Sequence, residues 1–315
     1  MTAEQPMVRP FRDEDLPAVL DLLRLSLGET PTRPKTQAWF EWKHFRNPFG
    51  RSLLLVAELE RQIVGLRALM RWELATPGGD RIRCARPVDT ATHPDFRRLG
   101  IFRRLTLAAI SEARQQGVEL LFNTPNPGSG EGYLAMGWRE VGTVGVMMRP
   151  KVGLLGRGSQ QPLAPEEMVA GAEAGVNLKI TDRPPLGLRT SRNAEYMAWR
   201  FEDNPAARYF QTGHGEDIVV LRSNLRRGRR ELVISDLFGQ AAPALRQMAR
   251  RCRAQYLVGW FSPGTPERRA AIRGGLIPIP GVRALTLVAR PLVDLDFDVL
   301  RFSNWDLALS DLELL

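Results

Sequence analysis

An internal repeat restricts the possible folds of this sequence more than any other feature. Three short segments of the N-terminal half recur in the C-terminal half in the same order. The pairs are WKHFRNP (42–48) with WRFEDNP (199–205), VELLFNTPN (118–126) with QYLVGWFSP (255–263), and MGW (136–138) with GGL (274–276). Agreement of three segments in one order favours a duplicated fold over chance. The 315 residues accommodate two such domains, at roughly 100 to 200 residues each.

Residues 151–176 separate the two repeats. They are rich in Gly, Pro and Gln and lack sustained hydrophobic periodicity, which is typical of a linker. We therefore expect a first domain at residues 1–150, a second domain at 177–293 and a C-terminal tail at 294–315. The tail is acidic, with six carboxylates among its residues, and it either docks on the basic body of the protein or stays in solvent.

Arginine carries most of the positive charge. The sequence has 44 basic and 35 acidic residues, a formal net charge of +9, and only four of the basic residues are lysines. This surplus suits either a plain solvated surface or a polyanionic partner, for which a phosphorylated cofactor would suffice. The basic runs at 226–230 and 250–253 stand beside no helix-turn-helix, zinc-finger or aromatic RNA-binding pattern, so we expect no nucleic-acid partner.

The cysteines, histidines and apolar runs bear on whether the protein is disulfide-rich, binds a metal or enters a membrane. Two cysteines and three histidines supply neither a disulfide framework nor metal-ligand spacing, so we expect no metal. No apolar run approaches the ~18 residues of a membrane-spanning helix, and the first residues lack a signal-peptide stretch. We expect a cytoplasmic protein without a membrane partner. The sequence does not indicate an oligomeric state.

Hydrophobic periodicity predicts a mixed α/β fold for the first domain, in the order β-α-β-β-β-α-β-α-β. Residues 53–60 and 62–74 form an expected antiparallel hairpin, and 86–92 an extended strand. A helix is predicted from 101 to Gly117, followed by a buried strand in 118–126. Residues 140–150 are predicted to form one last strand.

The segment VDTATHPDFRRLGIFRRLTLAAI (88–110) carries the clearest chemical signal. A strand leads into a loop with two arginines and a glycine, and this loop opens a helix. The first amides of a helix have no partners within it, and the helix dipole adds partial positive charge there. The sequence therefore predicts an anion site suited to a pyrophosphate, to which Arg97, Arg98, Arg103 and Arg104 add full charges.

This segment resembles motif A of the GNAT N-acetyltransferase superfamily, whose loop pattern is Q/R-x-x-G-x-G/A and which here reads RRLGIF (97–102). Asn126, Tyr133 and the pair Gly137-Trp138 resemble the family's N-x(6)-Y-x(3)-G-F ending. The sequence is more closely similar to a bacterial subgroup with a second, degenerate GNAT-like unit that carries a W-R-[FY]-x-x-x-P segment. The resemblance implies two GNAT-like acyltransferase units in tandem. The second unit has LFGQAAP (237–243) where the first has the arginine-glycine loop, so we expect it to be catalytically silent.

The resemblance also implies an acetyl-CoA site. The cofactor-binding residues that it implies are Ala91, Thr92, His93, Arg97, Arg98, Leu99, Gly100, Ile101, Phe102, Arg103, Asn126 and Tyr133. Tyr133, Asp89 and Asn126 are the implied catalytic residues, with Tyr133 protonating the departing thiolate and a backbone amide near residues 91–93 stabilising the oxyanion. Phe102 departs from the small residue of the family pattern.

The general base stays open. Asp89, His93 and Glu131 border the strand or its loop. His93 also suits a role in closing the strand, Asp89 equally suits a cap or a salt bridge to an arginine, and a water chain could replace all three. Asn126 equally suits a turn, because Pro-Asn-Pro-Gly is a strong turn signal. Tyr133 equally suits packing under the last strand.

The implied activity is acetyl transfer to a primary amine of a small molecule. An amino sugar or a sugar-nucleotide intermediate is the first acceptor that the subgroup suggests. Two alternatives remain: a tRNA-dependent aminoacyltransferase of cell-wall synthesis, which also pairs two GNAT-like units but predicts no pyrophosphate loop, and a non-catalytic binding module that retains the fold.

Overall fold

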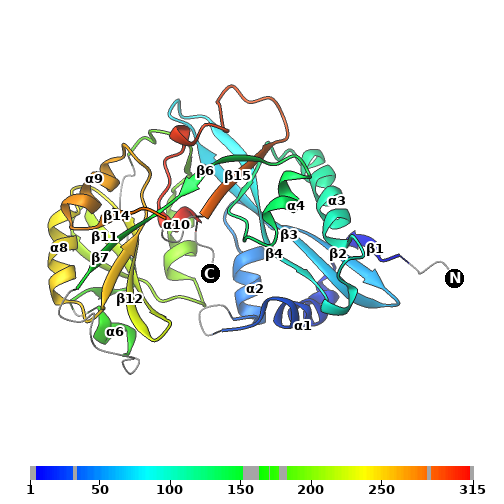
Figure 1. Ribbon diagram of the computed structural model, residues 1–315, viewed down its shortest axis with the longest axis horizontal. Helices are drawn as coiled ribbons and strands as arrows, with labels where there is room; N and C mark the ends of the chain where they lie inside the picture. Colours follow the sequence, from blue (N-terminus) through cyan, green and yellow to red (C-terminus); the bar gives the residue numbers. More distant parts are fainter. Residues whose placement is uncertain are drawn as a thin grey trace. The chain divides into compact units, whose positions relative to one another are not determined.

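The computed structural model describes residues 5–30, 34–151, 163–169, 171–176, 183–281 and 285–312. The chain forms two compact units, each with its own mixed sheet (Figure 1). The first unit comprises Met1–Leu74, Arg81–Val141 and Leu287–Leu300, and the second comprises Ala75–Asp80, Gly142–Thr286 and Arg301–Leu315. The α/β class and the two-unit organisation expected from the repeat are therefore confirmed.

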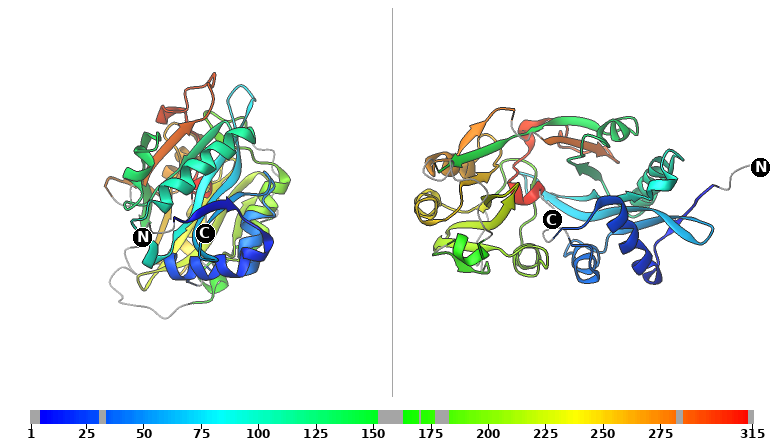
Figure 2. Two further views of the ribbon diagram at one scale, coloured as in Figure 1. Left: turned by 90° about the vertical axis from the view of Figure 1, so that its right-hand side faces the viewer. Right: turned by 60° about the horizontal axis from the view of Figure 1, so that its bottom comes forward.

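The first sheet contains strands in a mixed arrangement. Their order is β1 (Met7–Pro10), β2 (Leu53–Leu59), β3 (Gln62–Ala75), β4 (Arg81–Thr92), β5 (Leu120–Asn123), β15 (Leu285–Pro291) and β6 (Arg139–Val144). Strands β1, β2 and β3 pair antiparallel, whereas β4 and β5 pair parallel. Helices α1 (Leu16–Leu27) and α2 (Gln37–His44) cover one face, and α3 (Ile101–Gln115) and α4 (Gly130–Leu134) cover the other (Figure 2).

Helix α3 approaches the sheet closely because β3 has a glycine beneath it. A Cβ atom on Gly65 would lie 2.7 Å from Cγ2 of Ile101 and 2.9 Å from Cδ1 of Leu105. The apolar face of α3 packs with β2, β5 and the α4 turn into one buried cluster, which includes Tyr133 and Trp138. The start of α3, where the anion site is predicted, is therefore fixed by core packing.

The second sheet repeats the order of the first. It runs β8 (Glu173–Ala174), β10 (Phe210–His214), β11 (Asp217–Arg226), β12 (Arg229–Leu237), β13 (Tyr256–Gly259), β7 (Val146–Pro150) and β14 (Ile277–Ile279). The matched segments 118–126 and 255–263 supply β5 and β13, and each pairs parallel with its neighbour. The second unit also contains α8 (Ala242–Arg251) and α9 (Pro266–Arg273).

The two halves of the sequence exchange strands. The single last strand predicted at 140–150 is wrong, because the structure has β6 in the first sheet and β7 in the second, separated at Gly145. In the first sheet, the place beside β5 is taken by β15, with Val288 opposite Asn123 and Pro291 opposite Leu120. In the second sheet, β7 lies between β13 and β14.

The compact units are discontinuous, whereas the sequence suggests continuous domains at 1–150 and 177–293. Of the expected linker, residues 152–162 and 170 lie outside the described residues, and the remainder includes helix α6 (Pro165–Met168) and strand β8. The tail is split between the units. Its part from Trp305 to Leu312 is mostly buried, including helix α10 (Leu309–Leu312).

Among the described residues, no helix has both the length and the apolar character needed to cross a membrane.

Candidate functional site

A pocket of about 590 Å³ lies in the first unit beside the ends of β4 and β5. The parallel pairing of these strands joins Cys84–Ala85 to Leu120–Leu121, and the pocket is lined by residues that follow in both strands. Its lining residues are Leu27, Pro87, Val88, Asp89, Thr90, Thr92, Arg97, Phe102, Asn123, Pro125, Asn126, Gly128, Ser129 and Tyr133. Ligands of α/β sheets commonly bind in this position, outside the carboxyl ends of parallel strands.

The pocket brings together about half of the residues implied by sequence. Those that line it are Asp89, Thr92, Arg97, Phe102, Asn126 and Tyr133. Those that do not are Ala91, His93, Arg98, Leu99, Gly100, Ile101 and Arg103. Ala91 and Ile101 are buried in the core, whereas the loop from Arg98 to Gly100 is exposed.

The loop before α3 presents backbone amides to solvent. Arg98 and Gly100 have left-handed conformations, with φ of 68° and 71°, and Gly100 is the N-cap residue of α3. The first amide of α3 that forms a helical hydrogen bond is that of Arg104, which donates to the carbonyl of Gly100 at 3.0 Å. The preceding amides have no carbonyl partner within the helix, so they are free for an anion.

Phe102 does not obstruct this loop. Its ring packs edge-on against Tyr133, with centroids 5.6 Å apart, and a Cβ atom on Gly132 would lie 3.0 Å from it. The bulky side chain that departs from the family pattern therefore forms part of the pocket wall and the core beneath.

Tyr133 lies where α4 meets the core, with only 4% of its surface exposed. Its ring packs against Trp138 at 5.0 Å, so the packing role considered from sequence is present. Its hydroxyl also accepts a hydrogen bond of 2.9 Å from Nη1 of Arg67, and Tyr133 lines the pocket. Packing and access to the pocket thus coexist in one side chain.

Asp89 is the centre of a buried ion cluster. Its backbone has a φ of 45°, and its carboxylate lies 2.6 Å from Nζ of Lys43, 3.4 Å from Nε2 of His44 and 3.9 Å from Nζ of Lys35. Burial raises the pKa of Asp89, but Lys43, His44 and Lys35 outweigh it and hold that pKa well below its usual range. Both lysines also lie over the ring of Trp39.

His44 is neutral in this cluster, because burial lowers its pKa more than Asp89 raises it. Its Nδ1 lies 3.0 Å from the hydroxyl of Ser52. Asp89 therefore remains ionised through its lysine partners, and such a weakly basic carboxylate takes up a proton poorly. This environment disfavours Asp89 as a general base.

The remaining candidates have mainly structural contacts. Ring nitrogen Nδ1 of His93 accepts a hydrogen bond from the amide of Asp95 and caps a short turn, as the strand-closing interpretation suggested. The carbonyl of Asn126 accepts from the amides of Ser129 and Gly130, which fits the turn interpretation, while its side chain lines the pocket. Glu131 is exposed and does not line the pocket.

Two pocket features were missed from sequence. Asn123 ends β5 with its side-chain oxygen buried and without a hydrogen-bond partner among the described residues. Arg67 reaches the pocket wall from β3 through Tyr133 and Thr90. The available signal was a single charged residue inside the apolar run IVGLRALM, which does not reveal what the side chain contacts.

The second unit has a different loop at the corresponding place. There α8 begins at Ala242, within LFGQAAP (237–243), and the amide of Gln240 donates to the carboxylate of Asp217 at 2.5 Å. A Cβ atom on Gly239 would lie 2.3 Å from the same carboxylate oxygen. A carboxylate of the chain itself thus binds the backbone just before the start of α8.

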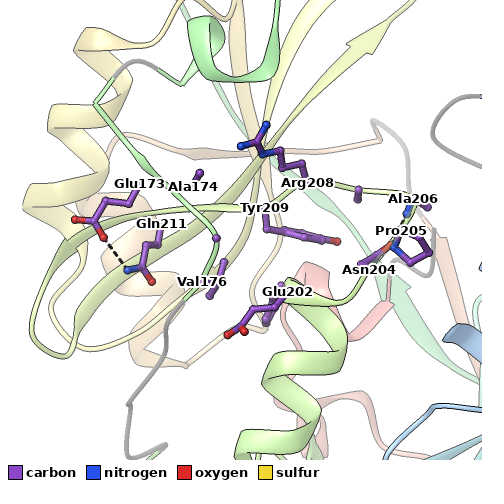
Figure 3. Close-up of a pocket in the computed structure, with 13 residues that line it drawn as sticks. Glu173, Ala174, Val176, Glu202, Asn204, Pro205, Ala206, Arg208, Tyr209 and Gln211 are labelled. Atoms are coloured by element: carbon purple, nitrogen blue, oxygen red, sulfur yellow. Dashed lines mark hydrogen bonds between the residues drawn. The ribbon is translucent and has the colours of Figure 1, made fainter.

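A larger pocket of about 850 Å³ lies in the second unit, beside β8, β10 and the segment after Phe201 (Figure 3). Its wall includes Glu173, which accepts a hydrogen bond of 3.0 Å from the side chain of Gln211, and Asn204, which accepts one from the amide of Ala206. No helix of eight or more residues starts among its lining residues, so this pocket lacks an anion-binding helix start. We therefore favour the smaller pocket as the candidate active site.

A family model described as an acetyltransferase (GNAT) domain matches residues 7–141. No curated protein sequence matches the chain significantly.

Solved structures match over most of the chain. A GCN5-related N-acetyltransferase from Anabaena variabilis has a TM-score of 0.63 at 13% identity, covering 92% of this chain and 73% of that one. Eis1 from Mycobacterium abscessus has a TM-score of 0.57 at 13% identity, with 91% and 73% covered. A putative acetyltransferase from Pyrococcus horikoshii has a TM-score of 0.53 at 12% identity, with 96% and 95% covered. At such identities these matches establish a shared fold.

Proposed function

We propose that the first unit transfers an acetyl group from acetyl-CoA to a primary amine, because a family model of the acetyltransferase (GNAT) domain matches residues 7–141. The observation that carries this proposal is the arrangement at one pocket. The hydroxyl-bearing Tyr133 and Arg97, which begins the exposed loop before α3, line the same cavity. Acetyl transfer from acetyl-CoA uses a proton donor for the departing thiolate and an anion site for the diphosphate of the cofactor. Tyr133 and the helix start supply these two groups.

The residues present fit acetyl-CoA. The amides between Arg98 and Arg103 would hold its pyrophosphate, since the left-handed conformations at Arg98 and Gly100 form an open turn at the helix start. Arg97 and Arg103 add positive charge beside them. When bound, acetyl-CoA supplies the activated acetyl thioester.

Two groups of the chain would act on the reacting atoms. A backbone amide near Ala91–His93, other than that of His93, which already donates to the carbonyl of Val64, would stabilise negative charge on the carbonyl oxygen. Tyr133 would donate a proton to the departing sulfur. Asp89 holds the lysine cluster behind β4, and we assign it this anchoring role in place of proton abstraction. The attacking amine loses its proton to water in the pocket.

We propose that the second unit has no catalytic role, because a carboxylate of the chain itself, Asp217, binds the backbone just before the start of α8. The acceptor that we would test first is an amino sugar, followed by other small primary amines. The proposal does not require a metal.

Acetyl-CoA binding is the direct test. Thermal unfolding is followed with acetyl-CoA added to the wild-type protein, and ligand at 100 times its dissociation constant should stabilise it by about 2.7 kcal/mol. Release of free CoA thiol is then measured with a panel of amines. Binding without turnover on any amine would leave only a binding module, and absence of binding would refute the proposal.

Two variants of one glycine control for the loop. Gly100→Ala places a side chain at a φ of 71° where no atom lies within 4 Å of the new Cβ, so its effect is backbone strain alone. Gly100→Asp adds a negative charge at the same position. We expect Gly100→Asp to raise the dissociation constant for acetyl-CoA about tenfold or more above that of Gly100→Ala, because the new carboxylate repels the diphosphate. Equal affinities would place the diphosphate elsewhere.

A further inference from the structure

Arg67 is a buried cation next to the pocket. It lies in the middle of β3, none of its surface is exposed, and no carboxylate among the described residues forms an ion pair with it. Its Nε and Nη2 atoms have no hydrogen-bond partner within the described part of the chain. A buried charge without a counter-charge is costly, so the fold retains Arg67 at the expense of stability.

The contacts of Arg67 converge on the pocket wall. Nη1 donates to the hydroxyl of Tyr133 and to that of Thr90, each at 2.9 Å. Tyr133 and Thr90 line the pocket, whereas Arg67 does not. The guanidinium also lies over the rings of Tyr133 and Phe102, 5.2 Å and 5.6 Å from their centroids. Arg67 can therefore act on a ligand only through its neighbours.

The donor inventory of the two groups fixes the direction of their hydrogen bond. A guanidinium has donors and no acceptor, whereas a phenol oxygen can both donate and accept. Tyr133 must therefore accept from Arg67, and its own hydrogen cannot point toward Arg67. That hydrogen is left to point away from β3, toward the pocket. A full positive charge at this distance also stabilises negative charge on the phenol oxygen.

We propose that Arg67 is a positioning residue that turns the Tyr133 proton into the pocket and stabilises the phenolate that remains after proton transfer. The inference rests on the proposed function. Tyr133 gives its proton to sulfur as the carbon–sulfur bond breaks with its electron pair on sulfur, and the phenolate afterwards takes up a proton from solvent. No oxidant, reductant or further reactant is needed.

A double-mutant cycle with Arg67→Met and Tyr133→Phe tests this coupling. Arg67→Met should lower kcat by about tenfold to hundredfold, within the range of general acid catalysis, and leave the KM for acetyl-CoA within about twofold. In the Tyr133→Phe background, Arg67→Met should cause no further loss of kcat, because the hydroxyl through which it acts is gone. Multiplicative losses would overturn the proposal.

Arg86→Met is the matched control. Arg86 is also a buried arginine of the same sheet, lying over the rings of Trp72 and Phe122, but it does not line the pocket. Its substitution should lower the melting temperature, and any loss of kcat should multiply with that of Tyr133→Phe. If Arg67→Met does not fold, Arg67→Lys replaces it in the cycle, because lysine keeps the positive charge and lacks the planar guanidinium. Arg67→Lys should also lower kcat, and this effect should also vanish in the Tyr133→Phe background.

A measurement without ligand separates the possible failures. With ¹³Cζ-labelled tyrosine, the four tyrosines give four signals, and Tyr133→Phe identifies one of them. Arg67→Met should shift the Tyr133 signal, and Arg86→Met should not. An unmoved signal would overturn the positioning role even in an active enzyme. A wild-type protein that turns over no acetyl-CoA would overturn the proposed function together with this inference, whereas an active wild type with multiplicative losses would overturn this inference alone.

Discussion

Buried charge beside the pocket is concentrated on Asp89. Its carboxylate forms ion pairs with two buried lysines, and its backbone within β4 has a left-handed conformation. Removing one member of a buried ion cluster leaves the other charges unpaired in a poorly solvated site. The cluster therefore links the stability of the first unit to the local shape of β4.

Asp89→Asn should destabilise the protein by about 3 to 5 kcal/mol, because Lys35 and Lys43 lose their counter-charge. Urea unfolding at neutral pH measures this difference. Asp13→Asn is the control, since Asp13 forms an exposed ion pair with Arg51 and its loss should cost about 0.5 kcal/mol or less. A normal stability with lost turnover for Asp89→Asn would instead restore Asp89 as the general base.

Asp236 in the second unit has the opposite electrostatic balance. Burial raises its pKa to about 6 with a further contribution from Asp311, although Arg192 at 2.9 Å opposes the shift. Its native form therefore keeps a proton at pH values where the unfolded form has lost it. As pH rises from about 4 to about 6, this site destabilises the native state progressively, by up to about 3 kcal/mol.

Asp236→Asn removes this titration. Relative to wild type, its unfolding free energy should rise as pH increases from about 4 to about 6, which urea unfolding at several pH values measures.

Asp306→Asn should show the opposite pH dependence, with an unfolding free energy that falls relative to wild type as pH rises. Burial raises the pKa of Asp306, but hydrogen bonds from Arg183 and the positive charge of Arg189 lower it overall, so its contribution is present above its unfolded pKa of 3.8 and fades on acidification. The deficit of Asp306→Asn should therefore shrink as pH falls below about 4, and parallel trends for the two variants would contradict both assignments.

At the scale of secondary-structure elements, the contact between β3 and α3 controls the loop that is proposed to bind acetyl-CoA. Gly65→Ala would place a Cβ atom 2.7 Å from Ile101, the first residue of α3. Helix α3 must shift outward, at a cost of about 1 to 3 kcal/mol, and move the amides at its start. We expect lower stability in urea unfolding and weaker acetyl-CoA binding together.

Gly78→Ala is the control for Gly65→Ala. Gly78 lies in an exposed turn, and its new Cβ atom would have no neighbour closer than 3.5 Å. It should change stability by about 0.5 kcal/mol or less. If Gly65→Ala loses stability but binds acetyl-CoA with unchanged affinity, the position of α3 does not determine binding.

At the scale of the whole chain, the repeat was readable from sequence because local signals preserve it. The matched Asn47 and Asn204 both accept a hydrogen bond from the amide two residues later, and Gly137 and Gly275 both have positive φ. Such turns need particular residues, so the sequence retains them. The class of fold and the helix-start loop could be predicted for the same reason.

The strand exchange could not be predicted in this way. The run VGVMMRP has the pattern of a strand whichever sheet it joins, because an apolar strand encodes burial and not the identity of its partner. Likewise, Arg67 is a single charge in an apolar stretch and Lys43 stands among aromatic and charged residues, and their partners Tyr133 and Asp89 are remote in sequence. Contacts between distant segments determined these features.

The exchange predicts that the first unit cannot fold from a continuous fragment. Residues 1–144 lack β15, whose Leu287, Val288 and Ala289 are buried beside β5. Such a fragment would expose the edge of β5 and an apolar surface, and we expect it to aggregate or to unfold without a cooperative transition. A fragment in which residues 285–300 follow 1–144 through a Gly/Ser linker should regain a cooperative thermal transition and bind acetyl-CoA. A cooperative transition of the shorter fragment alone would show that β15 is dispensable to the first sheet.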